Sequence, residues 1–239
     1  MADTVKLDNQ KMLQELMANH DFAPKTVVDE KLLNILMRLG NSGQQLRRLY
    51  KSLAKGADAY TYKTLVGDDM VFRFRYQGDQ IEIVKGNEHV SLNGNDFMFL
   101  LGCVDAVFSP IYPIGTVLIL DKDLLASELT EPFVDRPLEV VITSRKIPLE
   151  GEFSNYLIDY LARFWPYGEI PHTDPLFITN MMIERVEMMG PANQFEHDFS
   201  EKVLRTNQLA LNKRSAAFMD SEAARKYVGA IQDRKEDEG

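Results

Sequence analysis

Four segments between residues 109 and 191 carry most of the structural signal: SPIYPIGTVLIL (109–120), LEVVITSR (138–145), NYLIDYLARFWPYG (155–168) and FITNMMIERVEMMGP (177–191). The first two are rich in β-branched and aliphatic residues, which is typical of buried strands. In the third, apolar side chains recur at helical spacing from Phe153 to Phe164, which predicts a helix that ends at Pro166. The fourth predicts a strand. We therefore expect an α+β protein with a small, mainly antiparallel sheet packed by an aromatic helix.

Helical sections are expected on both sides of this region. Residues 1–60 contain three apolar helical faces, and Asp29 is placed to cap the second helix. In residues 61–108 an alternating pattern predicts a hairpin, followed by a linking helix that ends near Phe108. We expect residues 109–205 to form the α+β core, and residues 206–239 to form C-terminal helices and a charged tail.

The composition is that of a soluble globular protein, with 45% hydrophobic and 26% charged residues among 239. A formal net charge of −9 argues against a nucleic-acid binder and suits a basic partner. The N-terminus has no basic segment followed by an apolar one, and no apolar run approaches membrane-spanning length. We expect residence in the cytoplasm, and secretion without a cleaved signal stays open. Cys103, the single cysteine, excludes an intramolecular disulfide and suits a buried thiol.

Two groups of residues carry side chains of the kind that acid–base or metal chemistry needs. They are His172 to Asp174, in a loop between prolines, and Glu196 to Asp198, at the start of a helix. Neither group has the spacing of a known motif, since the chain contains no HExxH, CxxC, GxSxG or Walker sequence. Carboxylates at a helix start are explained by the helix dipole. We expect no catalytic residue, no cofactor and no metal.

Candidates for protein contact occur around the third segment. Arg145 follows a buried strand, and we expect it to pair with Asp159 or with a carboxylate of a partner. At the proline-rich turn, Trp165, Tyr167 and Ile170 form a candidate exposed patch, because Trp and Tyr often anchor interfaces. Packing of Trp165 in the core is the alternative.

A basic stripe gives further candidates on the third predicted helix. Arg47, Lys51 and Lys55 follow one another at four-residue steps on one face of this helix. The stripe has two interpretations: a docking surface for an acidic partner, or a solvated helix face.

The chain also resembles a domain-of-unknown-function family of Gram-positive bacteria over roughly residues 109–205. Members combine a proline-glycine entry to a first strand, a strand ending in Gly-Arg, an aspartate-tyrosine helix before a Tyr-Pro-x-Gly turn, and a closing strand. Ser144 stands where the family has glycine, and Trp165 stands where it usually has tyrosine. The matching positions are Pro113, Gly115, Thr116, Ser144, Arg145, Asp159, Tyr160, Trp165, Pro166, Gly168, Phe177, Asn180, Ile183, Val186 and Gly190.

Members of this family are found beside LXG polymorphic toxins and components of type VII secretion. The resemblance implies a non-enzymatic targeting factor or chaperone that binds an LXG toxin, together with small helical proteins, before export. The alternative is an immunity protein that neutralises the toxin. A targeting factor contacts the helical N-terminal region of the toxin, whereas an immunity protein contacts its C-terminal toxic domain.

Overall fold

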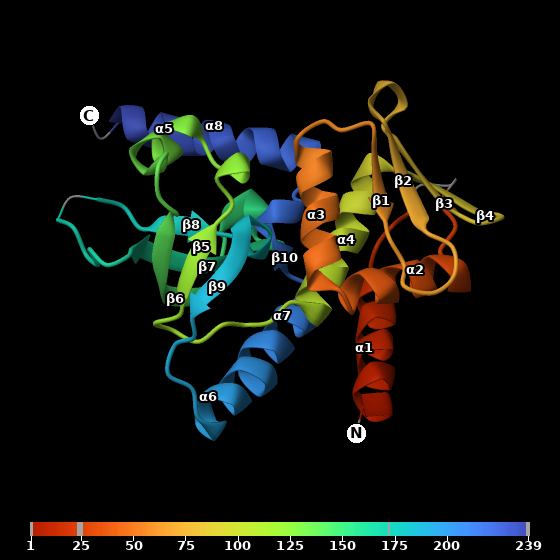
Figure 1. Cartoon of the computed structure of the whole chain (residues 1–239), viewed down its shortest axis with the longest axis horizontal. Helices are drawn as coiled ribbons and strands as arrows, with labels where there is room; N and C mark the ends of the chain where they lie inside the picture. Colours follow the sequence, from red (N-terminus) through yellow and green to blue (C-terminus); the bar gives the residue numbers. More distant parts are fainter. Residues whose placement is uncertain (1, 23–25, 172, 238–239) are drawn as a thin grey trace.

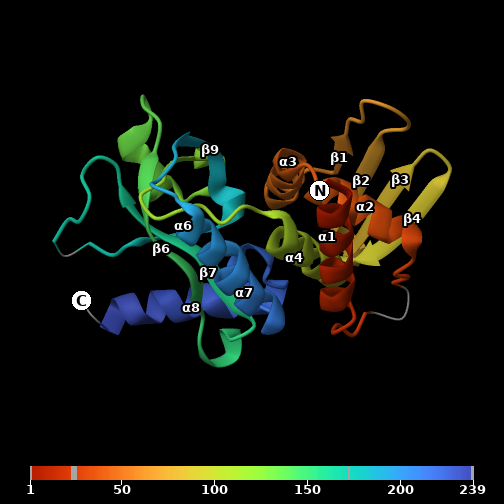
Figure 2. The same cartoon turned by 90° about the horizontal axis from the view of Figure 1, so that it is seen from below.

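The computed structural model describes residues 2–22, 26–171 and 173–237, and it has the expected α+β class. Its elements form two halves, each with its own sheet (Figure 1). Helices α3 and α4 lie between the sheets, as the view from below also shows (Figure 2). No helix in the described part of the chain is long and apolar enough to cross a membrane.

The N-terminal half combines four helices with a four-stranded antiparallel sheet. Asp29 caps the second helix as predicted, because its carboxylate accepts a hydrogen bond of 2.9 Å from the Leu32 amide. The predicted hairpin and linking helix are present, and one further strand lies before the hairpin and another after it. The elements are α1 (Ala2–Met17), α2 (Glu30–Gly40), α3 (Gly43–Ala54), β1 (Ala59–Tyr62), β2 (Met70–Arg75), β3 (Gln80–Lys85), β4 (Glu88–Asn93) and α4 (Gly94–Phe108).

Helix α4 is the central helix of this half. Almost every residue from Asp96 to Val107 is buried, since α1, α2 and the four-stranded sheet contact different faces of the helix. Cys103 is among these buried residues, and burial raises the pKa of its thiol to about 12. The thiol is therefore protonated at neutral pH, as expected of a buried structural cysteine.

The C-terminal half is built on a six-stranded sheet with the order β10-β7-β6-β5-β9, and β8 pairs with β7. All pairs are antiparallel except β10 with β7. The elements are β5 (Val117–Leu120), α5 (Ser127–Thr130), β6 (Glu139–Pro148), β7 (Tyr156–Phe164), β8 (Leu176–Ile178), β9 (Ile183–Met188), α6 (Gln194–Asp198), a π-helical segment (Phe199–Arg205), α7 (Thr206–Ala210), β10 (Arg214–Ser215) and α8 (Ser221–Asp237).

The predicted aromatic helix is wrong, because Tyr156–Phe164 is the strand β7. This strand has neighbours on both edges and is covered on both faces. Tyr160 lies in the core of the C-terminal sheet, and Asp159 lies on the opposite face, with both side chains fully buried. A strand buried on two faces has a nearly continuous apolar sequence, which mimics the spacing of a buried helix.

The predicted closing strand is divided in two. Leu176–Ile178 pairs with β7, whereas Ile183–Met188 crosses to pair with β5. A single 3₁₀ turn, Asn180–Met182, connects the two strands. Because of this turn, one continuous apolar sequence forms two strands at different positions in the same sheet.

Ser144 does not need the backbone freedom of glycine. The residue of strand β6 with a positive φ is Lys146, at 50°, two positions further along the chain. Strand β6 is irregular here, with a register shift between Ile142 and Ser144. The left-handed backbone at Lys146 lies beside Asp159, which Lys146 contacts.

Candidate functional site

Two carboxylates of the Glu196 to Asp198 group, which was considered for acid–base chemistry, are engaged in ion pairs within the chain. Glu196 pairs with Arg145, and Asp198 lies 3.0 Å from the Lys202 ammonium group. The Lys202 and Gln194 side chains lower the pKa of Asp198. His172 lies outside the described residues. Within those residues, no group of three or more His, Cys, Asp or Glu side chains is arranged to hold a metal ion.

Arg145 holds the π-helical segment against the sheet. Its side chain is only 7% exposed and forms an ion pair with Glu196. The same guanidinium donates to the Ser200 hydroxyl at 2.9 Å and lies 5.9 Å from the centre of the Phe199 ring. The expected pair with Asp159 is wrong, and Arg145 is not available to a partner's carboxylate.

Most of the basic stripe on α3 is also used within the chain. The Lys51 ammonium lies 2.6 Å from Asp121 and 2.9 Å from Asp123, and Lys55 lies 2.9 Å from Asp123. Hydrogen bonds from both lysines hold the pKa of Asp123 at about 2. These pairs join α3 of the N-terminal half to the loop after β5. Only Arg47 of the three predicted residues is left without a carboxylate partner in the described part of the chain.

The loop between β7 and β8 exposes the predicted aromatic patch. Trp165 is 39% exposed, Tyr167 57% and Ile170 38%. We call the segment between β7 and β8 that carries these three side chains the aromatic loop. It projects from the far left of the molecule in Figure 1. Of the two alternatives that the sequence left open for Trp165, the structure shows an exposed side chain and excludes packing in the core.

Hydrogen bonds at its base fix the conformation of the aromatic loop. The Trp165 amide donates to the Glu139 carbonyl, and the Gly168 amide donates to the Phe164 carbonyl, both at 2.9 Å. The Arg163 side chain spans the loop, since it donates to the Thr173 carbonyl at 2.6 Å. A loop held in this way loses little conformational freedom when it binds.

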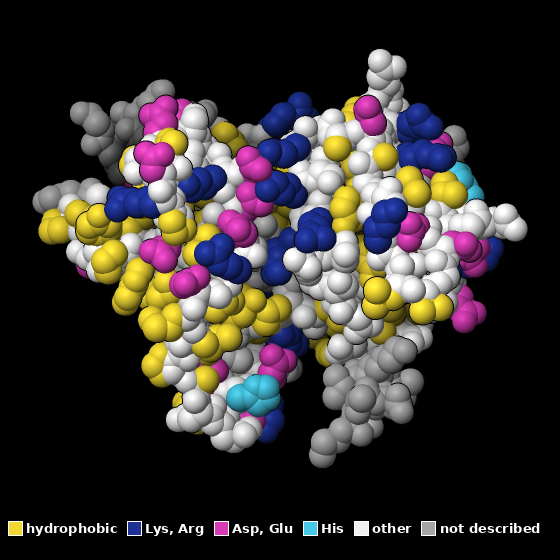
Figure 3. Space-filling model, viewed as in Figure 1, with side chains coloured by type: hydrophobic (Ala, Val, Ile, Leu, Met, Phe, Trp, Pro, Cys, Tyr) yellow, Lys and Arg dark blue, Asp and Glu magenta, His cyan; other side chains and the backbone are white. Residues whose placement is uncertain are grey.

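Sequence reasoning missed a second apolar surface on the C-terminal half. Figure 3 shows hydrophobic side chains gathered over the lower part of this half, beside the segment that leads to α6. Met188, Met189 and Ile114 are each at least half exposed, and Phe195 is 78% exposed. Phe195, Phe199 and Val203 recur at four-residue steps through α6 and the π-helical segment, and all three are exposed. This spacing is the sequence signal that could have found the surface.

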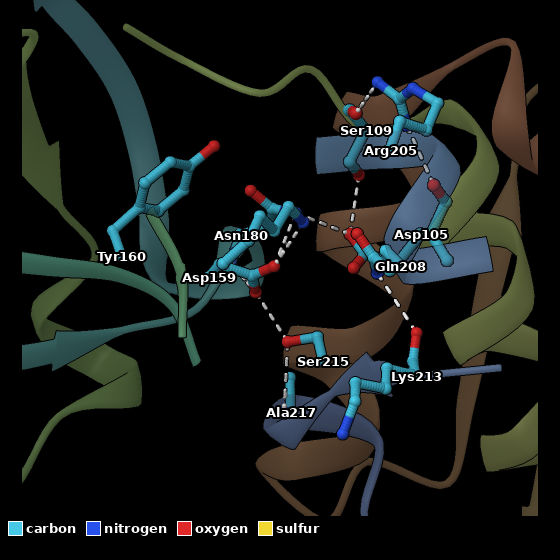
Figure 4. A network of polar contacts seen from close by, with 12 residues as sticks. Asp105, Ser109, Asp159, Tyr160, Asn180, Arg205, Gln208, Lys213, Ser215 and Ala217 are labelled. Carbon is cyan, nitrogen blue, oxygen red and sulfur yellow. Dashed lines mark hydrogen bonds and ion pairs between the residues drawn. The ribbon is translucent and has the colours of Figure 1, made fainter. Parts of the chain in front are cut away.

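A buried polar network joins the two halves (Figure 4). Asp159 of β7 is fully buried and receives four hydrogen bonds. Its donors are the Lys146 ammonium at 2.8 Å, the Ser215 hydroxyl at 2.6 Å, and the backbone and side-chain amides of Asn180 at 3.0 and 3.4 Å. This arrangement satisfies a carboxylate that is far from water.

Asp105 of α4 belongs to the same network. Its Oδ1 accepts from the Ser109 hydroxyl at 2.6 Å and from the Asn180 side-chain amide at 3.1 Å. Burial, and then the charge of Asp159, raise the pKa of Asp105 to about 6. Its Oδ2 has no hydrogen-bond partner within the described residues. Both carboxylates are shielded from solvent, so they position α4 against the sheet and offer no reactive group at the surface.

Arg205 completes the junction at the end of α4. Its guanidinium is buried and donates to the carbonyls of Ala106, Val107 and Ser109 at 2.8, 3.2 and 2.9 Å. An arginine in this position satisfies carbonyl groups that a helix leaves unpaired at its C-terminus. The π-helical segment, which carries Arg205, is thus attached both to α4 and, through Arg145, to the sheet.

No protein-family model matches the chain, and no match is found among curated proteins or solved structures. The family resemblance of residues 109–205 therefore stays a prediction. The described surface has two exposed apolar areas on the C-terminal half, and the predicted polar contacts Arg145, Lys51 and Lys55 are engaged within the chain.

Proposed function

We propose that the chain is a non-enzymatic accessory protein, a targeting factor or chaperone, which binds an LXG-type toxin in the cytoplasm for export by type VII secretion. The observation that carries this proposal is the aromatic loop. It presents Trp165, Tyr167 and Ile170 to solvent on a backbone that hydrogen bonds hold in place. Exposed Trp and Tyr side chains on a rigid support are characteristic of protein interfaces.

The position of the family-like motifs supports the same proposal. The entry Pro113 and Gly115 precedes β5, and Arg145 lies in β6. The aspartate-tyrosine pair lies in β7, and the Trp165 to Gly168 turn is the base of the aromatic loop. The resembling residues thus belong to one sheet and to the loop that extends from it.

The second apolar surface suits the helical partners that the resemblance implies. Phe195, Phe199 and Val203 line one side of a helix and are exposed. A helix from another protein that packs along this line would bury apolar surface that the chain itself leaves in water. This arrangement favours a protein that holds more than one partner at a time.

Pull-down experiments test the proposal with the two halves of the toxin encoded beside this chain. The tagged full chain is incubated separately with the helical N-terminal LXG region and with the C-terminal toxic domain. Capture of the N-terminal region is the expected result. Capture of the toxic domain alone, with loss of toxicity, would make the chain an immunity protein, and capture of neither half would contradict both functions.

A further inference from the structure

A basic groove lies between α3 and the beginning of β9, at the seam between the two halves. Its volume is about 410 Å³, within the usual range for small-ligand sites. Arg47 and Arg48 of α3 line one wall, and Arg185 of β9 lines the other. Met181 and Ile183 add buried apolar surface. In Figure 3, dark blue Lys and Arg side chains gather along this seam, although the chain as a whole is acidic.

Two of these cations have no carboxylate to neutralise them. Asp121 is bound to Lys51, and Glu184 lies 3.3 Å from Arg185, so the acidic groups of the groove are already paired. The guanidinium groups of Arg47 and Arg48, by contrast, make neither an ion pair nor a hydrogen bond within the described part of the chain. Two adjacent guanidinium groups on one wall attract carboxylates and can bind them with paired N–H donors.

The other wall is the open edge of a sheet. Strand β9 is the last strand in the order β10-β7-β6-β5-β9, and it pairs only with β5 among the described strands. Its outer backbone groups are therefore available for an added strand. An extended segment that pairs with β9 would direct alternate side chains towards α3.

We propose that this groove binds an extended, acidic segment of a partner protein. The backbone of the segment pairs with β9 near Arg185, and carboxylates at alternate positions contact Arg47 and Arg48. The charge of the groove selects an acidic segment, and the strand edge selects an extended one. Helix α3, which lines the groove, and the aromatic loop lie on opposite sides of the C-terminal sheet (Figure 1), and the inference holds whether or not the proposed function is correct.

The test is a titration of the full ¹⁵N-labelled chain with an eight-residue peptide of alternating Glu and Thr. In an extended peptide all the Glu side chains lie on one face. We expect amide shifts at Glu184 to Val186 and weakening of the interaction at high salt. The same peptide with Gln in place of Glu, and one with N-methyl groups on the backbone edge that pairs, should each bind at least tenfold more weakly.

The double variant Arg47→Ala/Arg48→Ala should lose at least tenfold in affinity for the Glu peptide. Its fold is protected, since neither guanidinium has a hydrogen bond within the described residues. The control is Arg73→Ala, which removes another exposed arginine from β2 and should bind as the wild type does. Equal binding of the Gln or N-methyl peptide, unchanged affinity of the double variant, or equal binding of an oligonucleotide of the same charge would overturn the proposal.

Discussion

Asp105 and Asp159 lie on opposite sides of the junction between the two halves, and one side-chain amide bridges their carboxylates. The Asn180 Nδ2 atom is 3.1 Å from Asp105 Oδ1 and 3.4 Å from Asp159 Oδ1. Asp159 has the Lys146 cation as a neighbour, whereas no cation among the described residues contacts Asp105 directly. The two acids therefore occupy different electrostatic environments in one network.

The first prediction concerns the pH dependence of stability. The folded-state pKa of Asp105 is about 6, above its ordinary value of 3.8, so the folded state binds the extra proton between these values. The contribution of Asp105 to the free energy of unfolding therefore falls by about 3 kcal/mol at most as pH rises from about 4 to about 6. Above this range the contribution is constant.

The Asp105→Asn variant isolates this effect in urea unfolding at several pH values. Its free energy of unfolding should rise relative to the wild type between pH about 4 and about 6. Other carboxyls, such as Glu201, have a lowered pKa and stabilise in the opposite direction, but they are common to both proteins and cancel. A wild-type-to-variant difference that does not change with pH would contradict the prediction.

The second prediction concerns the buried Lys146–Asp159 pair. Lys146→Met keeps an unbranched side chain of nearly the same length but leaves Asp159, which is fully buried, without its cation. We expect a loss of about 3–5 kcal/mol at pH 7, because an unpaired buried charge is strongly destabilising. The exposed pair of Lys226 with Glu222 is the control, and Lys226→Ala should leave unfolding unchanged. Similar stability of the two variants would show that the buried pair is not important.

A third prediction compares two glycines at the ends of neighbouring helices. A Cβ atom at Gly40, the last residue of α2, would lie 2.4 to 2.6 Å from the Phe108 ring, whereas at Gly43 it would meet nothing within 4 Å. Gly40→Ala should cost about 1–3 kcal/mol through overpacking. Gly43→Ala should be neutral or stabilising by up to about 1 kcal/mol, because alanine favours the helix. Thermal unfolding of both variants tests the contrast, and equal melting temperatures would contradict it.

Sequence patterns predicted α2 and the β2–β3 hairpin well because each has one face exposed to solvent. Asp29 as a cap, the helical spacing in α2 and the alternation around Phe72 and Phe74 are local signals. β7 gave the wrong signal, since it is buried on both faces and pairs along one edge with β10, which lies far away in sequence. Only the folded chain shows that Asp159 has a buried cation beside it.

Local sequence signals also located some of the candidate contact residues correctly and could not show the ion-pair partners of others. Trp165, Tyr167 and Ile170 are exposed as predicted, because a turn rich in proline remains on the surface. Lys51 and Lys55 form a helix face in the sequence, but Asp121 and Asp123 are about seventy positions away in the chain. Ion pairs at such separations have no local pattern, so the sequence left the docking interpretation open.

Two exposed side chains carry the central claim, that this chain binds a toxin through its C-terminal half. Trp165→Ala/Tyr167→Ala removes the aromatic rings from the loop without disturbing the backbone hydrogen bonds at its base. Leu65→Ala/Val66→Ala is the matched control, because both residues are exposed (104% and 87%) in the connection between β1 and β2. It removes similar apolar surface from the N-terminal half.

The decisive measurement is the affinity of the wild type and both double variants for the N-terminal LXG region, by isothermal titration calorimetry. We predict that the wild type and Leu65→Ala/Val66→Ala bind equally, and that Trp165→Ala/Tyr167→Ala binds at least tenfold more weakly, as expected when interface anchors are removed. Absence of binding by the wild type, or equal affinity of all three proteins, would contradict the account.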